Sequence, residues 1–376
     1  SHRMLGDRSR IFTIGLIAAW LALVAAPILV SVALNQSMAG LPLLGVVIWF
    51  ILLRVARQVS PAAYVDSLMR RGKYSQALAR CDRALALTGP SAWIGSRRLV
   101  WLNRRTAALL GLGRADEALQ AALDAIAESP DSETLGNCAL ALLRLNRLDE
   151  ASQVARQVMD LTRERSVAAH TVLAGVKLHR GMPAEAEALA RAGLTDVKAL
   201  LPLVKPDHHT LCLAILCRAQ RMQGEHEEQH AILGDLRRAA GANPVLQVIG
   251  LMEEIDGLPD TPQGHDRGFD LLEASYEVAP HYVLWYITQP GVLTNLRGDR
   301  RFLPYLEQAT EEFQRFAERA PNSETTHDAL EKAALTATPS PARQSSQAAL
   351  LAQVLTLSGT LLLLLLWIWR FFIAGV

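Results

Sequence analysis

One pattern of small residues occurs twice in this chain, in almost the same phase, and it strongly restricts the fold. A small residue at a turn is followed by alanine five and twelve positions later, and then by proline. The two copies contain Gly72, Ala77, Cys81, Ala84 and Pro90, and then Gly113, Ala118, Ala122, Ala125 and Pro130. Alanine lets two helices approach to the short end of the 8–10 Å range of interaxial distances, so the pattern predicts antiparallel helix pairs. Such pairs stack into arrays, and arrays bind other chains.

Weaker copies of the same pattern continue along the chain. Turns are predicted at Asn146, Gly181 and Gly224, and alanine recurs five positions after the first two, at Ala151 and Ala186. After Gly224 the corresponding residue is Gln229, and a sixth, degenerate copy ends at Pro280. No strand-like alternation persists between Val55 and Leu335, which predicts a helical middle segment.

The pattern resembles the tetratricopeptide repeat family, whose unit is a helix pair of about 34 residues. The resemblance covers most of Ser60–Pro280 and implies an all-α, TPR-like α-solenoid with five to six helix pairs over residues 59–280. Capping helices are expected over 281–335. In many bacterial proteins of this family an arginine–phenylalanine pair opens the final helix, and Arg301-Phe302 resembles that pair, which implies a last helix over Arg300–Ala320.

Uncharged segments at both ends predict membrane spans. No charged residue occurs from Ile11 to Leu53, a run too long for one crossing of a hydrocarbon core of about 30 Å. Residues 1–58 are therefore interpreted as an N-terminal tip followed by a transmembrane helical hairpin, with spans at about 11–34 and 41–55. A flexible linker, 336–347, leads to a C-terminal transmembrane helix within 348–376. A cleaved signal peptide is the alternative, but its apolar region is usually 7–15 residues long.

Arginines set the predicted orientation. Arg3, Arg8 and Arg10 precede the first span, and Arg54 and Arg57 follow the second. Positive residues stay on the cytoplasmic side, so we expect a multi-pass protein of the inner or plasma membrane with a cytoplasmic repeat domain. The spacing of the four cysteines matches no disulfide framework, as expected for thiols in a reducing compartment.

The family resemblance also implies which residues would bind a partner. The first helix of each pair lines the concave face in tetratricopeptide repeats. Carried over position by position, that face includes Met69, Arg70, Asn103, Leu140, Leu143, Arg144, Leu178, His179, Arg218, Arg221 and Met222. Core packing is an equally good interpretation for any single leucine. A helix or extended segment with apolar anchors and acidic groups would suit the arginines and leucines of this set.

Charge is distributed unevenly along the middle segment. Basic residues predominate from Arg54 to Ala115, and acidic residues from Glu253 to Leu335. The basic part is interpreted either as a surface for anionic lipid or as solvated helix faces combined with the topology signal. Nucleic acid is not expected as a partner, because no aromatic residues interleave the arginines to stack on bases.

One short motif suggests an enzyme. His226-Glu227-Glu228-Gln229-His230 fits the H-E-x-x-H pattern, in which two histidines hold zinc and the glutamate activates water. It falls at the start of a predicted second helix, where polar residues are ordinary, and a third ligand is missing. We predict that no metal, cofactor or catalytic residue is present. Signatures for phosphate, dinucleotide and serine-hydrolase chemistry are absent from the sequence.

These observations favour a membrane-anchored scaffold or adaptor that binds a protein partner through its concave surface, and a subunit of a membrane protein complex is one form that such an adaptor could take. Two other classes stay open. One is a zinc-dependent membrane metalloprotease acting through residues 226–230. The other is a mainly structural subunit whose transmembrane spans make the contacts.

Overall fold

The computed structural model describes residues 62, 64–87, 95–163, 165–200, 206–289 and 291–336, and all regular secondary structure in these ranges is helical. The prediction of an all-α chain is therefore confirmed. The chain divides into two compact units, Ser1–Val65 and Asp66–Val376, and the description below concerns the second.

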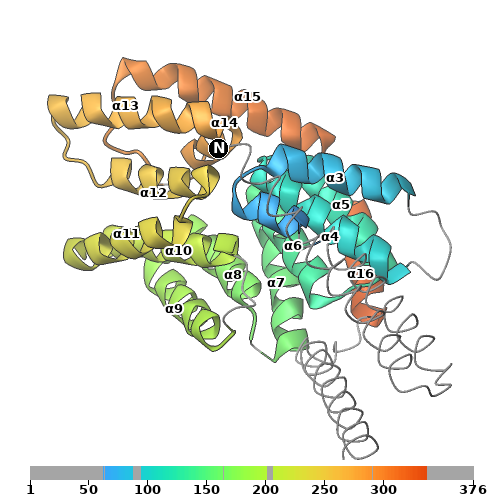
Figure 1. Ribbon diagram of the computed structural model, residues 1–376. Helices are drawn as coiled ribbons and strands as arrows, with labels where there is room; N and C mark the ends of the chain where they lie inside the picture. Colours follow the sequence, from blue (N-terminus) through green and yellow to red (C-terminus); the bar gives the residue numbers. More distant parts are fainter. Residues whose placement is uncertain are drawn as a thin grey trace, which may run out of the picture. The chain divides into compact units, whose positions relative to one another are not determined.

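Residues 66–70 complete a helical segment that precedes the labelled helices of Figure 1. The helices that follow are α3 (Tyr74–Leu87), α4 (Gly95–Gly111), α5 (Ala115–Glu128), α6 (Ser132–Arg144), α7 (Leu148–Thr162), α8 (Val167–His179), α9 (Pro183–Leu200), α10 (Pro206–Gln223), α11 (His226–Ala240), α12 (Pro244–Asp256), α13 (Pro262–Val278), α14 (Pro280–Ile287), α15 (Leu303–Arg319) and α16 (Ser323–Thr336). A 3-10 turn, Arg300–Phe302, leads into α15.

The same turn recurs five times and defines the helix pairs. Each turn residue has a positive φ, and these residues are Gly72, Gly113, Asn146, Gly181 and Gly224. At every one, the next residue donates its backbone N–H five residues back, as Lys73 does to Leu68 and Arg147 does to Leu142. This bond belongs to the Schellman motif, which satisfies the last carbonyls of a helix through a left-handed residue. The predicted turn positions are confirmed.

The alanines five positions after these turns are fully buried. Ala77, Ala118, Ala151 and Ala186 each have 0% exposure, and Gln229, which replaces alanine in the fifth pair, is also buried. Ala186 of α9, for example, packs with Leu178 of α8 and Ala219 of α10. Small side chains thus occupy positions where neighbouring helices meet, as the sequence predicted.

Neighbouring pairs stack through their first helices and through packing of the second helix of one pair on the first helix of the next. Helix α8 packs on α6, α7 and α10, and α10 packs in turn on α9 and α12, so the pairs form a repeat-like helical array. Two contacts link its distant parts. Asn243, before α12, donates to the carbonyl of Met69 and the hydroxyl of Tyr74, and α16 returns to pack on α5 (Figure 1).

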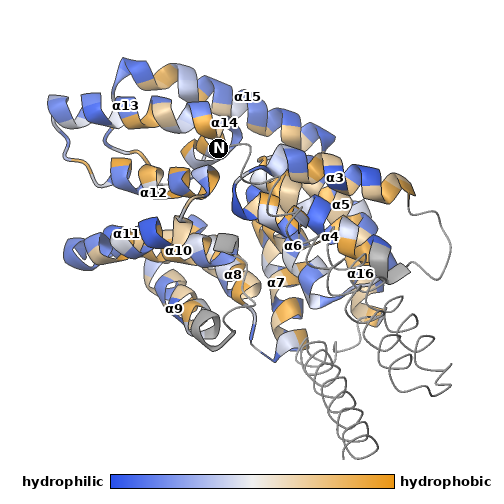
Figure 2. Ribbon diagram, viewed as in Figure 1, coloured by the Kyte–Doolittle hydropathy of each residue, from blue (hydrophilic) through white to orange (hydrophobic). Residues whose placement is uncertain are grey.

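Hydropathy follows this packing. Apolar residues predominate in α14, while α11 and α15 carry many hydrophilic residues on their visible faces (Figure 2). Only Ala309 is buried within α15, whereas five of the eight residues of α14 are buried: Tyr282, Val283, Leu284, Tyr286 and Ile287. Helix α14 is therefore an internal element of the second unit.

The predicted membrane localisation is corrected by the structure. Within the described ranges, no helix combines the length and the apolar character that a bilayer crossing requires. The predicted spans at 11–34, 41–55 and within 348–376 lie outside the described residues.

Replacing Ala118 by leucine tests the close-contact positions. Because Ala118 has no exposed surface, the larger side chain is expected to force α4 and α5 apart and lower the free energy of unfolding by about 1–3 kcal/mol. Ala127→Leu is the matched control, since Ala127 is exposed on the same helix, and should change it by less than about 0.5 kcal/mol. Urea unfolding followed by circular dichroism measures both, and equal effects would contradict the packing described.

Candidate binding site on the inner face of the helix pairs

Several of the predicted partner-binding residues lie together on the face formed by the first helices of the pairs. They come from α6, α8 and α10, and they border a cavity of about 40 Å³ that α14 closes on one side. The residues lining it are Leu140, Leu143, Arg144, Thr171, Gly175, Leu178, His179, Leu211, Ala214, Ile215, Arg218, Tyr282, Trp285 and Gln289. The helical phase of the array therefore brings six predicted residues to one place: Leu140, Leu143, Arg144, Leu178, His179 and Arg218.

The other predicted residues do not line this cavity. Asn103 of α4 is buried, and Met69 is buried with its carbonyl bonded to Asn243. Arg70 is exposed, and the Met222 side chain at the end of α10 is 40% exposed. Arg221 instead joins a buried polar network next to the cavity.

Helix α14 contributes the aromatic part of the site. Its Tyr282 and Trp285 border the cavity, and the guanidinium of Arg144 lies 3.7 Å from the Trp285 ring centroid and 4.8 Å from that of Tyr282. Arg218 lies over the Tyr286 ring at 4.5 Å. Cations within about 6 Å of a ring centroid are attracted to its face, and more strongly when water is excluded. The inner arginines are thus bound to aromatic rings of the same chain.

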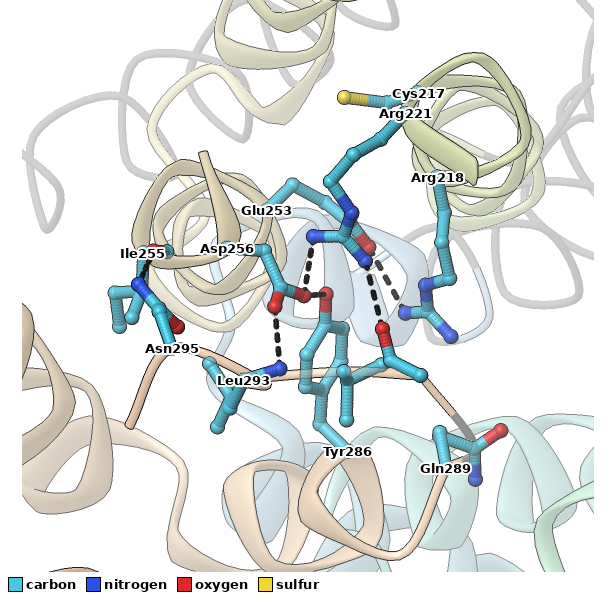
Figure 3. A network of polar contacts seen from close by, with 12 residues as sticks. Cys217, Arg218, Arg221, Glu253, Ile255, Asp256, Tyr286, Gln289, Leu293 and Asn295 are labelled. Atoms are coloured by element: carbon cyan, nitrogen blue, oxygen red, sulfur yellow. Dashed lines mark hydrogen bonds and ion pairs between the residues drawn. The ribbon is translucent and has the colours of Figure 1, made fainter. Parts of the chain in front are cut away.

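Two ion pairs join α10 to α12 next to α14 (Figure 3). The Arg218 guanidinium lies 2.9 Å from Glu253, which has 0% side-chain exposure, and Arg221 lies 2.6 Å from Asp256, which has 1%. The hydroxyl of Tyr286 donates to Asp256 at 2.8 Å. A buried ion pair with further hydrogen bonds is costly to break, because removal of one partner leaves an uncompensated charge.

The loop that follows α14 is held by the same network. The backbone N–H of Leu293 donates to Asp256, and Arg221 donates to the Gly291 carbonyl at 3.3 Å (Figure 3). Arg297 donates to the carbonyls of Ile287 and Val292. Helix α14 and its loop are therefore anchored at several points on α10 and α12.

Burial governs the titration of the groups around the cavity. It lowers the pKa of His179 to about 4, and the positive charge of Arg218 adds to this effect, while a hydrogen bond with Gln289 opposes it. Burial also lowers the pKa of Arg144 to about 10, so that this guanidinium is still charged at neutral pH. The cavity thus holds cationic arginines beside a neutral histidine.

The cysteines are buried thiols. Burial raises the pKa of Cys81, Cys138 and Cys217 to about 12, and Cys212 is also a buried thiol. Because the thiolate is the reactive form, these side chains are poor nucleophiles in the folded chain.

The H-E-x-x-H segment lies on the first turn of α11. His226, Glu227 and His230 are exposed, and Glu228 forms an ion pair with Arg191 of α9. Nδ1 of His230 lies 3.0 Å from the carbonyl oxygen of His226. A search of the described ranges finds no group of three histidine, cysteine or carboxylate side chains placed to hold a metal ion.

In comparisons with known proteins, no family model and no curated protein matches this chain. The likeness to tetratricopeptide repeats consequently rests on the turn and alanine positions themselves.

Sequence reasoning missed the part of the site that α12 and α14 supply. Two signals pointed to it. Three of the few aromatic residues of the chain, Tyr282, Trp285 and Tyr286, follow Pro280 within one helix, and the acidic excess that begins at Glu253 could have been matched to the arginines of α10. Neither signal specifies by itself that these segments fold back onto the inner face.

Glu253→Gln tests the buried ion pair. The substitution leaves the Arg218 charge buried without a counter-charge and should lower the free energy of unfolding by about 3–5 kcal/mol. Glu254→Gln is the matched control, because its partners Arg237 and Arg267 are exposed and such pairs contribute about 0–1 kcal/mol. Urea unfolding at neutral pH compares them, and a Glu253 effect as small as that of Glu254 would contradict the network.

His179→Gln tests the neutral histidine. The pKa of His179 is about 4 in the folded chain and near 6.5 when unfolded, so the unfolded chain binds more protons between these values. The free energy of unfolding of the wild type should therefore fall as the pH drops from 6.5 to 4. The variant has no histidine to titrate at this position. The difference in the free energy of unfolding between the wild type and the variant should therefore shrink by about 2 kcal/mol as the pH falls from 6.5 to 4. Urea titrations at several pH values measure it, and a constant difference would refute the assignment.

Proposed function

We propose that this chain is a non-enzymatic scaffold of tetratricopeptide type, whose helix pairs bind a protein partner at the inner face. The observation that carries the proposal is the convergence of α6, α8 and α10 on one apolar and cationic surface. That surface already accommodates a helix, because α14 lies on it with aromatic residues against Arg144 and Arg218. Surfaces that receive a helix through apolar anchors and a few charges are a recurring mode of peptide recognition.

The partner would contact the part of the inner face that α14 leaves uncovered. Arg218 and Arg221 are already paired with Glu253 and Asp256, so the positive charges of these two arginines do not require acidic groups of a protein partner. Met222, at the end of α10, is exposed and adaptable, and methionine suits a surface that accommodates partners of varied shape. The edge of the inner face near Met222 is therefore the proposed contact surface.

A second candidate is a structural module whose inner face is permanently closed. The burial of Tyr286 and Ile287, both with 0% exposure, favours this candidate, because an outside ligand could replace α14 only by opening a buried network. In that case partners would contact the outer helices of the pairs.

Site-specific photo-crosslinking in cells separates the two candidates. The chain offers a matched pair, since Met222 and Met182 are each 40% exposed, the former in the predicted inner set and the latter in the turn before α9. A photoreactive amino acid at 222 should give a discrete protein adduct that position 182 does not give. Adducts at neither position, or the same adduct at both, would contradict partner binding at the inner face.

A further inference from the structure

The inner face contains one more positive charge than its own carboxylates compensate. Arg218 is paired with Glu253, and Arg221 with Asp256. No ion pair joins Arg144 to a carboxylate within the described ranges; its guanidinium lies over the rings of Trp285 and Tyr282. A guanidinium stacked on aromatic faces still presents its N–H groups in the plane, where a planar anion can accept two of them.

One further polar atom near Arg144 lacks a partner. Among the described residues, Nε of Arg218 makes no hydrogen bond, although the atom is buried. Arg218 as a whole is only 7% exposed. Its side chain borders the same cavity as Arg144. Buried donors without acceptors are rare in folded proteins, and each one calls for a ligand or water.

The cavity itself restricts what could satisfy these groups. Its volume of about 40 Å³ is enough for a few water molecules or for a small polar group with one or two carbon atoms inside. Apart from the polar groups named above, its walls are largely aliphatic, with Leu143, Leu178 and Ala214 among them. An anion with a short apolar chain matches this lining better than a fully hydrated inorganic ion.

We propose that this cavity binds the carboxylate of a small organic acid, with the oxygens accepting hydrogen bonds from Arg144 and Arg218 and the alkyl chain against the leucines. A single negative charge is expected, because one arginine is uncompensated. His179 borders the same cavity and is neutral at physiological pH, so it adds no charge to the site. The inference does not rest on the proposed function, because it requires no protein partner.

Ligand-observed saturation-transfer NMR on the full chain tests the proposal with acetate and with acetamide, which has the same shape but no charge. Acetate should bind at least tenfold more tightly than acetamide. Inorganic phosphate should compete more weakly than acetate. Equal binding of the acid and the amide, tighter binding of phosphate, or no acetate signal with the folded protein would overturn the proposal.

Two variants locate the site. Arg144→Gln should weaken acetate binding at least tenfold, whereas Arg70→Gln, which alters an exposed arginine outside the cavity, should leave it unchanged. Circular dichroism checks that each variant is folded. If Arg144→Gln is unfolded, Ala214→Val tests the location of the site instead, because it fills the cavity and keeps every charged group. Ligand binding that survives Ala214→Val would refute the proposed location.

Discussion

The attachment of α14 to the inner face is the constraint on which the rest of the structure depends. Arg218 and Arg221 lie in one turn of α10 and Glu253 and Asp256 in one turn of α12, so the two ion pairs fix the register of these helices. Tyr286 then joins Asp256 by a hydrogen bond and Arg218 by its ring. In a dry interior each of these interactions is strong only while the others persist, so α10, α12 and α14 behave as one unit.

This arrangement changes how the predicted partner-binding residues of the inner face are interpreted. The sequence indicated a partner with apolar anchors and acidic groups, and the chain itself supplies both, the anchors from α14 and the acids from α12. The part of the inner face that α12 and α14 leave uncovered is small. It consists of the exposed edge near Met222 and the cavity beside Arg144. Much of the inner face of this array of helix pairs is therefore core.

Much of the fold could be predicted because it depends on local chemistry. A left-handed turn residue such as Gly113, followed by a contact alanine such as Ala118, specifies a helix pair within about 34 residues. The site could be predicted only in part. Helical phase placed Leu143, Arg144 and Arg218 on one face, but which segment covers them is decided by contacts between residues far apart in sequence, and no local pattern encodes these. The predicted membrane localisation failed to find support in the described helices.

Native-state hydrogen exchange of the α14 amides tests the central claim most directly. If α14 is a permanent part of the inner face, the amides of its last turn, Trp285 to Ile287, should exchange only through global unfolding, with the same free energy of opening as the central amides of α6 and α8. Exchange of the α14 amides at a much lower free energy, while α6 and α8 stay protected, would show instead that α14 detaches from an intact array.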